Sequence, residues 1–222
     1  MSELKVPELY QAFSQSEYGR HLEQRTRWDD FRPEWATTEL WCDLLGDDVN
    51  NLRHMPHTTG IAVSFAAATN LSVSETDTLL TTAITHDWGE AIIGDIPLPA
   101  KTEEDEKKEF IAYRHIAQTL FGNRGDRLAD RVLPVLGHED KEMGDMFRAV
   151  EYVGYCTTAL RAGRVAVSLT HGFTELDITR KQKEGLIGSL LSLENAVKTN
   201  GFSTLTQYVK KYKIGDIVEP SI

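Results

Sequence analysis

Cysteine is scarce in this chain, whose 222 residues include only Cys42 and Cys156. Their separation does not match the spacing of a cysteine metal site, and we expect a fold that does not depend on disulfide bonds. The first residues also lack the apolar core of a signal peptide. Together these absences favour a cytoplasmic protein.

Positive charge is also in short supply. The chain has 24 lysine and arginine residues against 34 aspartate and glutamate residues, which gives a formal net charge of -10. This balance argues against a broad basic surface, so we expect no stable binding to nucleic acid. A small anionic ligand needs only a local group of cations and is not excluded. No apolar run approaches the length of a membrane span, and we expect no membrane partner.

The sequence contains no convincing pair of strands and no internal repeat. Its length and its hydrophobic fraction of 41% suit one sizeable soluble core. Apolar residues recur at helical spacing along most of the chain. We therefore predict an all-α protein, a compact helical bundle with a single domain over residues 1–222. The motif-bearing core covers residues 10–165, and C-terminal helices at 176–212 either pack on it or form an interface.

Capping residues, prolines and glycines set the expected helix boundaries. The charged helix at 103–121 reads as solvent-exposed, with Gly122 ending it, and Gly163 is expected to end a later apolar helix. The expected helices lie at 7–25, from Thr37 or Thr38 to Gly46, from Pro56 onward, from Ser72 or Ser74 to Asp87, and at 103–121, 127–136, 146–160, 177–197 and 202–212.

The stretch I-T-H-D-W-G-E-A-I-I-G-D-I-P-L-P-A-K, residues 84–101, carries the strongest chemical signal. It places His86 and Asp87 side by side at the predicted end of a buried helix, with Glu90 and Asp95 close behind. Buried charge is costly unless it is paired or bound to a metal. Imidazole and carboxylate together suit a divalent cation. An isolated His-Asp pair would more simply be a local hydrogen bond, but four polar groups in an apolar segment favour the metal site.

One helix cannot surround an ion, so further ligands must come from other helices. The sequence offers His57 near one helix start and Glu151 in a later apolar helix. The resulting pattern, H…HD…D/E, resembles that of the HD-domain metal-dependent phosphohydrolases. With the Arg27-Trp28 pair included, the chain looks like the bacterial HD-domain 5′-deoxynucleotidases and the related phage dATP triphosphohydrolases. The resemblance runs from about residue 10 to residue 165 and is strongest over 84–101.

This resemblance implies a metal site formed by His57, His86 and Asp87. The family's fourth ligand is an aspartate in the pattern A-D-x-x-x-A-Y, and here the corresponding stretch holds Glu151 instead. Asp145 is the alternative fourth ligand. The ion implied is divalent, one of Co, Mn, Fe, Zn or Mg.

The resemblance also implies roles around the metal. Glu90 and Asp95 would handle the attacking water and the leaving group, or hold further ions. Arg27 would bind phosphate, Trp28 would pack near the sugar or base, and Lys101 is a further phosphate candidate. Of the remaining histidines, His54 and His138 could approach the site; for His54 a surface or helix-cap role is the simpler expectation.

The function implied is hydrolysis of deoxynucleotides, first of all 5′-deoxynucleotidase activity on deoxynucleoside monophosphates. A deoxynucleoside triphosphate triphosphohydrolase of the dATP type is the alternative. A second alternative is a catalytically weak HD module that binds a nucleotide, for which the glutamate at position 151 is the only feature. Because relatives are often dimers, a homodimer is expected.

Overall fold

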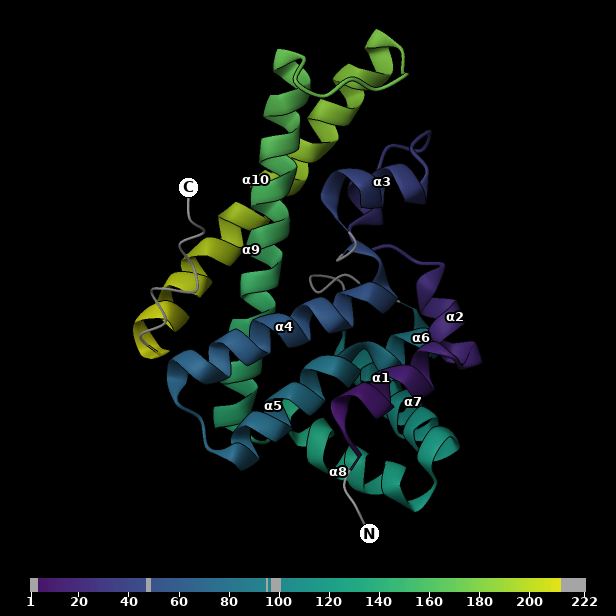
Figure 1. Cartoon of the computed structure of the whole chain (residues 1–222), viewed down its shortest axis with the longest axis vertical. Helices are drawn as coiled ribbons and strands as arrows, with labels where there is room; N and C mark the ends of the chain where they lie inside the picture. The colour runs from purple at the N-terminus through teal and green to yellow at the C-terminus, as the bar shows by residue number, and fades with distance from the viewer. Residues whose placement is uncertain (1–3, 47–48, 95, 97–100, 213–222) are drawn as a thin grey trace.

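The computed structural model describes residues 4–46, 49–94, 96 and 101–212, and every regular element in these ranges is a helix (Figure 1). The all-α prediction is confirmed. The elements, with η marking 3-10 helices, are α1 (Val6–Ser14), α2 (Glu17–Glu23), η1 (Asp29–Phe31), α3 (Thr38–Leu45), α4 (Asn51–Thr69), α5 (Val73–Thr85), η3 (His86–Gly89), α6 (Glu90–Ile93), α7 (Glu103–Phe121), α8 (Asn123–Leu136), α9 (Lys141–His171) and α10 (Arg180–Tyr212).

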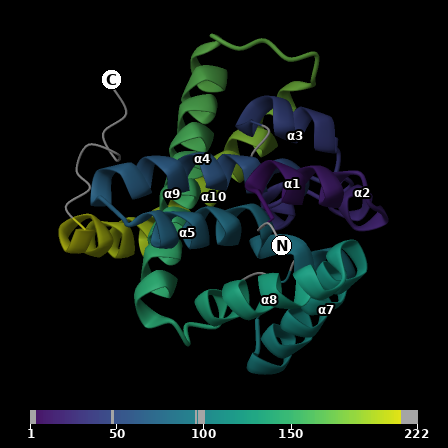
Figure 2. The same cartoon turned by 60° about the horizontal axis from the view of Figure 1, so that its bottom comes forward.

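Two long helices, α9 and α10, form an antiparallel pair that extends away from a packed group of shorter helices (Figures 1 and 2). The N-terminal part of α9 enters that group and contacts α4, α5 and α8. The helix α10 packs mainly along α9, and α3 lies against α9 as well. The C-terminal helix therefore folds back on the chain, whereas its use as an interface stays a prediction. Among the described residues, no helix is long and apolar enough to cross a membrane.

The start of α4 differs from the prediction. Asn50 caps this helix, because its side chain accepts hydrogen bonds from the backbone N–H groups of Leu52 and Arg53. The helix thus begins at Asn51, and Pro56 lies inside it rather than in its first turn. The additional turn carries His54, which the sequence analysis had expected at a surface or cap position.

Other boundaries differ from the prediction either through a local cap or because the helix continues past a glycine. The first expected helix is divided by Ser16, whose side chain accepts a hydrogen bond from Gly19 and caps α2. Gly163 does not end a helix, since α9 continues past it, and the two expected C-terminal helices are the single helix α10, which passes through Gly201. The helices α8 and α9 also begin earlier than predicted.

The helix α7 has the predicted bounds but not the predicted environment. Thr102 and Asp105 form a capping box at its start, and Gly122 ends it. One face is buried rather than solvated, with Glu109, Tyr113 and Ile116 at helical spacing against neighbouring helices. The prediction of an exposed helix was therefore wrong for this face, which the long charged run of the sequence concealed.

Candidate metal centre

The His86–Asp87 pair lies in the turn η3, directly after α5, and this turn is held by buried contacts. Trp88 is fully buried and stacks on Phe13 with ring centroids 4.9 Å apart. The hydroxyl of Tyr113 donates a hydrogen bond of 2.8 Å to Thr85, the last residue of α5. These contacts fix the backbone on both sides of the pair, so the two functional side chains are rigidly placed.

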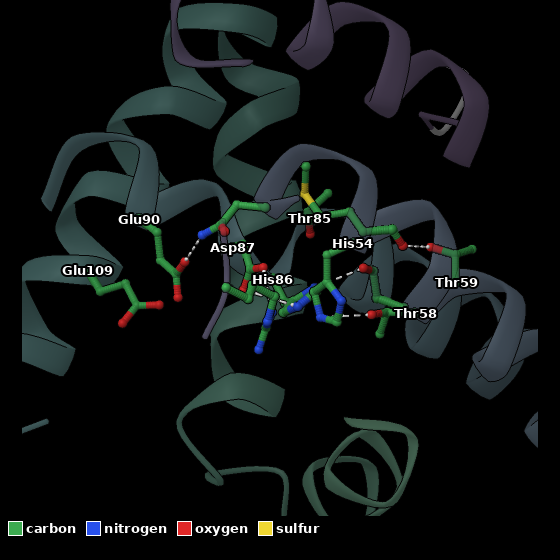
Figure 3. Close-up of polar contacts among 12 residues, drawn as sticks. His54, Thr58, Thr59, Thr85, His86, Asp87, Glu90 and Glu109 are labelled. Carbon is green, nitrogen blue, oxygen red and sulfur yellow. Dashed lines mark hydrogen bonds and ion pairs between the residues drawn. The ribbon is translucent and has the colours of Figure 1, made fainter. Parts of the chain in front are cut away.

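Three buried side chains from two parts of the chain meet here: His54 of α4, and His86 and Asp87 of η3 (Figure 3). One ligand atom from each lies within 4.8 Å of the others. His54 forms a 3.0 Å hydrogen bond with the Thr58 hydroxyl, and its ring packs edge-on against that of His86. Two imidazoles and a carboxylate form a donor set suited to a divalent transition metal.

The hydrogen bonding of His86 supports a cation at this position. Its Nδ1 donates to the backbone oxygen of Ala83 at 2.9 Å, so Nε2 is the ring nitrogen that faces Asp87. Buried Nε2 has no hydrogen-bond partner, although it lies 3.0 Å from Oδ1 of Asp87. At this separation, the ring nitrogen and the carboxylate oxygen need a positive charge close to both, which a proton on Nε2 or a bound metal ion would supply. The residues present therefore fit a divalent cation.

His57 was predicted as the first metal ligand, but it is not part of this group. It lies three residues after His54 on α4 and is half-buried. Its role as a ligand stays a prediction. The signal that could have pointed to His54 is Asn50, a strong N-cap residue, because a helix start there brings His54 and Thr58 onto one buried face.

Glu151 and Asp145, the two candidates for the fourth ligand, lie in different surroundings on α9. Burial raises the pKa of Glu151. The charges of His86 and Arg27 oppose this shift and that of Asp87 adds to it, so the carboxyl group lies within electrostatic range of the proposed metal site. Asp145 instead forms a 2.6 Å ion pair with Lys211. The hydrogen bond from the Lys211 ammonium lowers the pKa of the Asp145 carboxyl. Neither residue belongs to the group of His54, His86 and Asp87, so Glu151 as the fourth ligand stays a prediction.

Arg27 reaches the cluster from the segment before α3. Its backbone N–H donates to Val49 at 2.7 Å, which ties the segment to the start of α4. The guanidinium donates to Oδ2 of Asp87 at 3.2 Å and to the Tyr155 hydroxyl at 3.5 Å. Trp28 has a left-handed backbone with φ of 65° and packs edge-on against the Tyr155 ring. The Arg27-Trp28 pair thus lies beside the metal site, and Tyr155 is a neighbour that the sequence analysis missed.

Glu90 begins α6 and is held by α4 and by the segment after α2. Its Oε2 accepts a 3.3 Å hydrogen bond from Asn51, and its backbone oxygen accepts one from Arg25. Figure 3 draws Glu90 and Glu109 on the opposite side of Asp87 from His54. Asp95, the other predicted proton-transfer residue, lies outside the described residues.

Lys101 and Glu109 form an ion pair near Glu90 and Asp87. Burial alone would lower the pKa of Lys101, but Glu109, Glu90 and Asp87 together raise it. Glu109 is buried, and burial raises the pKa of its carboxyl while Lys101 opposes the shift. Glu109 was missed because it follows a run of charged residues that suggested a solvated face.

Comparison with known proteins supports the resemblance at the level of the domain. Residues 46–145 match a family model described as the HD domain. No curated protein and no solved structure matches the chain. The matched stretch includes the buried group of His54, His86 and Asp87, but neither Arg27 nor Glu151. Such a match suggests metal-dependent phosphohydrolase chemistry and leaves the substrate open, and the likeness to the HD domain covers the region from 46 to 145.

Proposed function

We propose that this protein is a metal-dependent hydrolase of deoxynucleotides, acting first of all as a 5′-deoxynucleotidase on deoxynucleoside monophosphates. The observation that carries the proposal is the buried group of His54, His86 and Asp87, in which His86 Nε2 faces Asp87. The Arg27-Trp28 pair beside this group supports a phosphorylated ligand, because a guanidinium binds phosphate oxygens in a bidentate manner.

The metal would be held by His54, His86 and Asp87, with Glu151 as the fourth side chain. When bound, a divalent ion would supply a Lewis acid for a phosphoryl oxygen and a more acidic water. The Nδ1–H bond from His86 to Ala83 fixes the tautomer and the orientation of that ring. Arg27 would keep its contact with Asp87 on one side and offer its other N–H groups to the phosphate.

Proton transfer falls to Glu90 in this proposal. Asn51 donates to one carboxylate oxygen of Glu90, so the carboxylate is oriented and its other oxygen can accept a proton from the attacking water. Trp28 and Tyr155 would bound the nucleoside side of the pocket, since their rings pack against each other next to Arg27. Asp95 is kept as a second proton-transfer candidate on the family resemblance alone.

An activity screen tests this proposal directly. The purified chain is incubated with Mn²⁺ or Co²⁺ and with deoxynucleoside mono-, di- and triphosphates. Phosphate is then measured by a colorimetric assay, and nucleoside and triphosphate by chromatography. We expect monophosphates to yield nucleoside and phosphate in equal amounts, and no product without metal. Loss of the nucleotidase activity on adding a chelator, with recovery on adding metal, is the matching control.

The same screen separates the alternatives. Release of triphosphate from dATP, with no free phosphate, would favour the triphosphohydrolase. Metal-dependent nucleotide binding without any turnover would favour a binding module. Absence of both metal binding and turnover would overturn the assignment of the site.

A further inference from the structure

The Lys101–Glu109 ion pair lies beside the proposed metal site but joins two different elements. Glu109 comes from the middle of α7, and Lys101 precedes that helix. Both side chains are largely enclosed, at 24% exposure for Lys101 and 10% for Glu109. A buried ion pair contributes little to stability in general, because desolvation offsets the attraction. We therefore consider a role for this pair other than stabilising the fold.

Close packing at Gly89 sets the position of Glu109. A Cβ atom at residue 89 would lie 2.5 Å from both Cγ and the backbone oxygen of Glu109, so α7 touches the η3 backbone directly. The backbone of Gly89 has ordinary right-handed helical angles, and space alone demands the glycine here. Because η3 also carries His86 and Asp87, this contact fixes the distance between Glu109 and the proposed metal ligands.

Lys101 faces more negative charge than one carboxylate. Its ammonium pairs with Glu109, and the charges of Glu90 and Asp87 also raise its pKa. The Lys101 side chain is 24% exposed, so these carboxylates do not enclose it completely. A cation that is held by a buried carboxylate and still partly open can bind a phosphoryl oxygen without first being ordered, which lowers the entropy cost of binding.

We propose that Glu109 is a positioning residue that holds Lys101 in place to bind the phosphoryl group of the substrate. This inference rests on the function proposed above and extends it to a residue outside the motif. Glu109 itself does not touch the substrate; it acts through the ammonium of Lys101. The ligand chemistry is a phosphate monoester dianion or inorganic phosphate.

The direction in which Glu109→Gln changes phosphate affinity distinguishes a positioning role from simple charge repulsion. If Glu109 were only a nearby negative charge, Glu109→Gln would strengthen the binding of phosphate. If it positions Lys101, the same substitution weakens binding, because Lys101 loses its fixed orientation. We expect about tenfold weaker binding of inorganic phosphate to the Mn²⁺-loaded protein, measured by calorimetry. The KM for a monophosphate substrate should rise more than kcat falls.

Matched variants complete the test. Glu104→Gln removes the same charge from an exposed position on α7, and Lys108→Met removes a lysine from an exposed position; neither should change phosphate affinity. Lys101→Met should weaken phosphate binding as much as Glu109→Gln does. In the Lys101→Met background, Glu109→Gln should have no further effect, and this double variant avoids leaving a lone charge buried.

The outcomes are separable from those of the proposed function. Tighter phosphate binding in Glu109→Gln, or an equal effect of Glu109→Gln with and without Lys101, would overturn the positioning role while leaving the metal centre intact. Mn²⁺ affinity and thermal unfolding are measured for each variant, and both should stay near the wild-type values for the double variant of Lys101→Met and Glu109→Gln, which leaves no lone buried charge. A wild-type protein that binds neither Mn²⁺ nor phosphate would overturn both proposals together.

Discussion

Two glycines of this molecule make room for a glutamate, and the two regions differ in what the contact achieves. At Gly89, the turn η3 meets both the side chain and the backbone of Glu109 on α7. At Gly163, α9 meets only the carboxyl end of Glu194 on α10. Glu109 pairs with a lysine from another segment, whereas Glu194 pairs with Lys198 one turn along its own helix.

The contact at Gly89 positions residues of the proposed site, whereas the contact at Gly163 only allows two long helices to pack together. The Gly89 contact brings residues from separate segments together around His86 and Asp87. The Gly163 contact lets two long helices approach, and its glutamate can move aside because the atoms involved are the end of a flexible side chain. The first contact is therefore rigid and the second is tolerant, which leads to unequal effects of matched substitutions.

The largest effect is expected at the metal centre itself. Asp87→Ala removes a proposed ligand and one partner of Arg27, so metal binding and turnover should both be lost, with activity down by at least about a thousandfold. Circular dichroism should report a folded protein, since Trp88 and its stacking partners remain. The control in the α9–α10 region is Asp145→Asn, which should keep full metal affinity. Unchanged turnover in the Asp87 variant would falsify the assignment.

The next comparison exchanges each glycine for alanine. Gly89→Ala forces the backbone of η3 away from α7, and we expect about 1–3 kcal/mol of lost stability together with a large loss of activity. Gly163→Ala requires only that Glu194 rotate, and alanine favours a helix interior by about 0.5–1 kcal/mol. Urea unfolding and turnover measure the two effects. Equal losses in both variants would contradict the contrast between the two regions.

A third prediction concerns the two histidines of α4. His54→Ala should weaken Mn²⁺ binding by at least about tenfold, because its ring belongs to the buried group that could hold a metal ion. His57→Ala should have a smaller effect, since His57 is not in that group. Direct titration with Mn²⁺ followed by electron paramagnetic resonance decides between them. The reverse ranking would restore His57 as the ligand that the family resemblance implies.

The smallest effect lies at the end of α10. The hydrogen bond from Lys211 lowers the pKa of Asp145, so this pair stabilises the folded state above the pKa of an unfolded aspartate and ceases to do so as pH falls through the lower folded-state value. At neutral pH, Asp145→Asn should cost about 0.2–1 kcal/mol, as expected for a pair near the surface. Unfolding curves of the two proteins should converge below about pH 3.

Much of the fold was predictable from local signals. The all-α class follows from helical spacing, and the caps at Thr37 and Ser72 mark two helix starts correctly. Local signals failed where long-range packing decides. Gly163 and Gly201 look like helix ends in sequence, yet each lies where another helix or side chain packs closely and the helix continues.

The candidate site divides in the same way. His86 and Asp87 were predictable because the signal is local: an apolar helix that ends in charged residues. His54 was not, because its place depends on where α4 begins, and the capping by Asn50 competed with the apparent start at Pro56. Glu109 was concealed by the charged residues that precede it, and only the packing of α7 against Gly89 reveals that it is buried.

By itself, the sequence determined that the chain is helical and that a histidine and an aspartate stand together in a segment rich in apolar residues, which is where we place the proposed metal site. These are local properties, set by the spacing of neighbouring side chains. The tertiary structure alone decided that His54 stands beside His86, that Arg27 reaches Asp87, and that Glu109 holds Lys101. The physical reason is that each of these pairs joins residues distant in sequence, whose meeting depends on how whole helices pack.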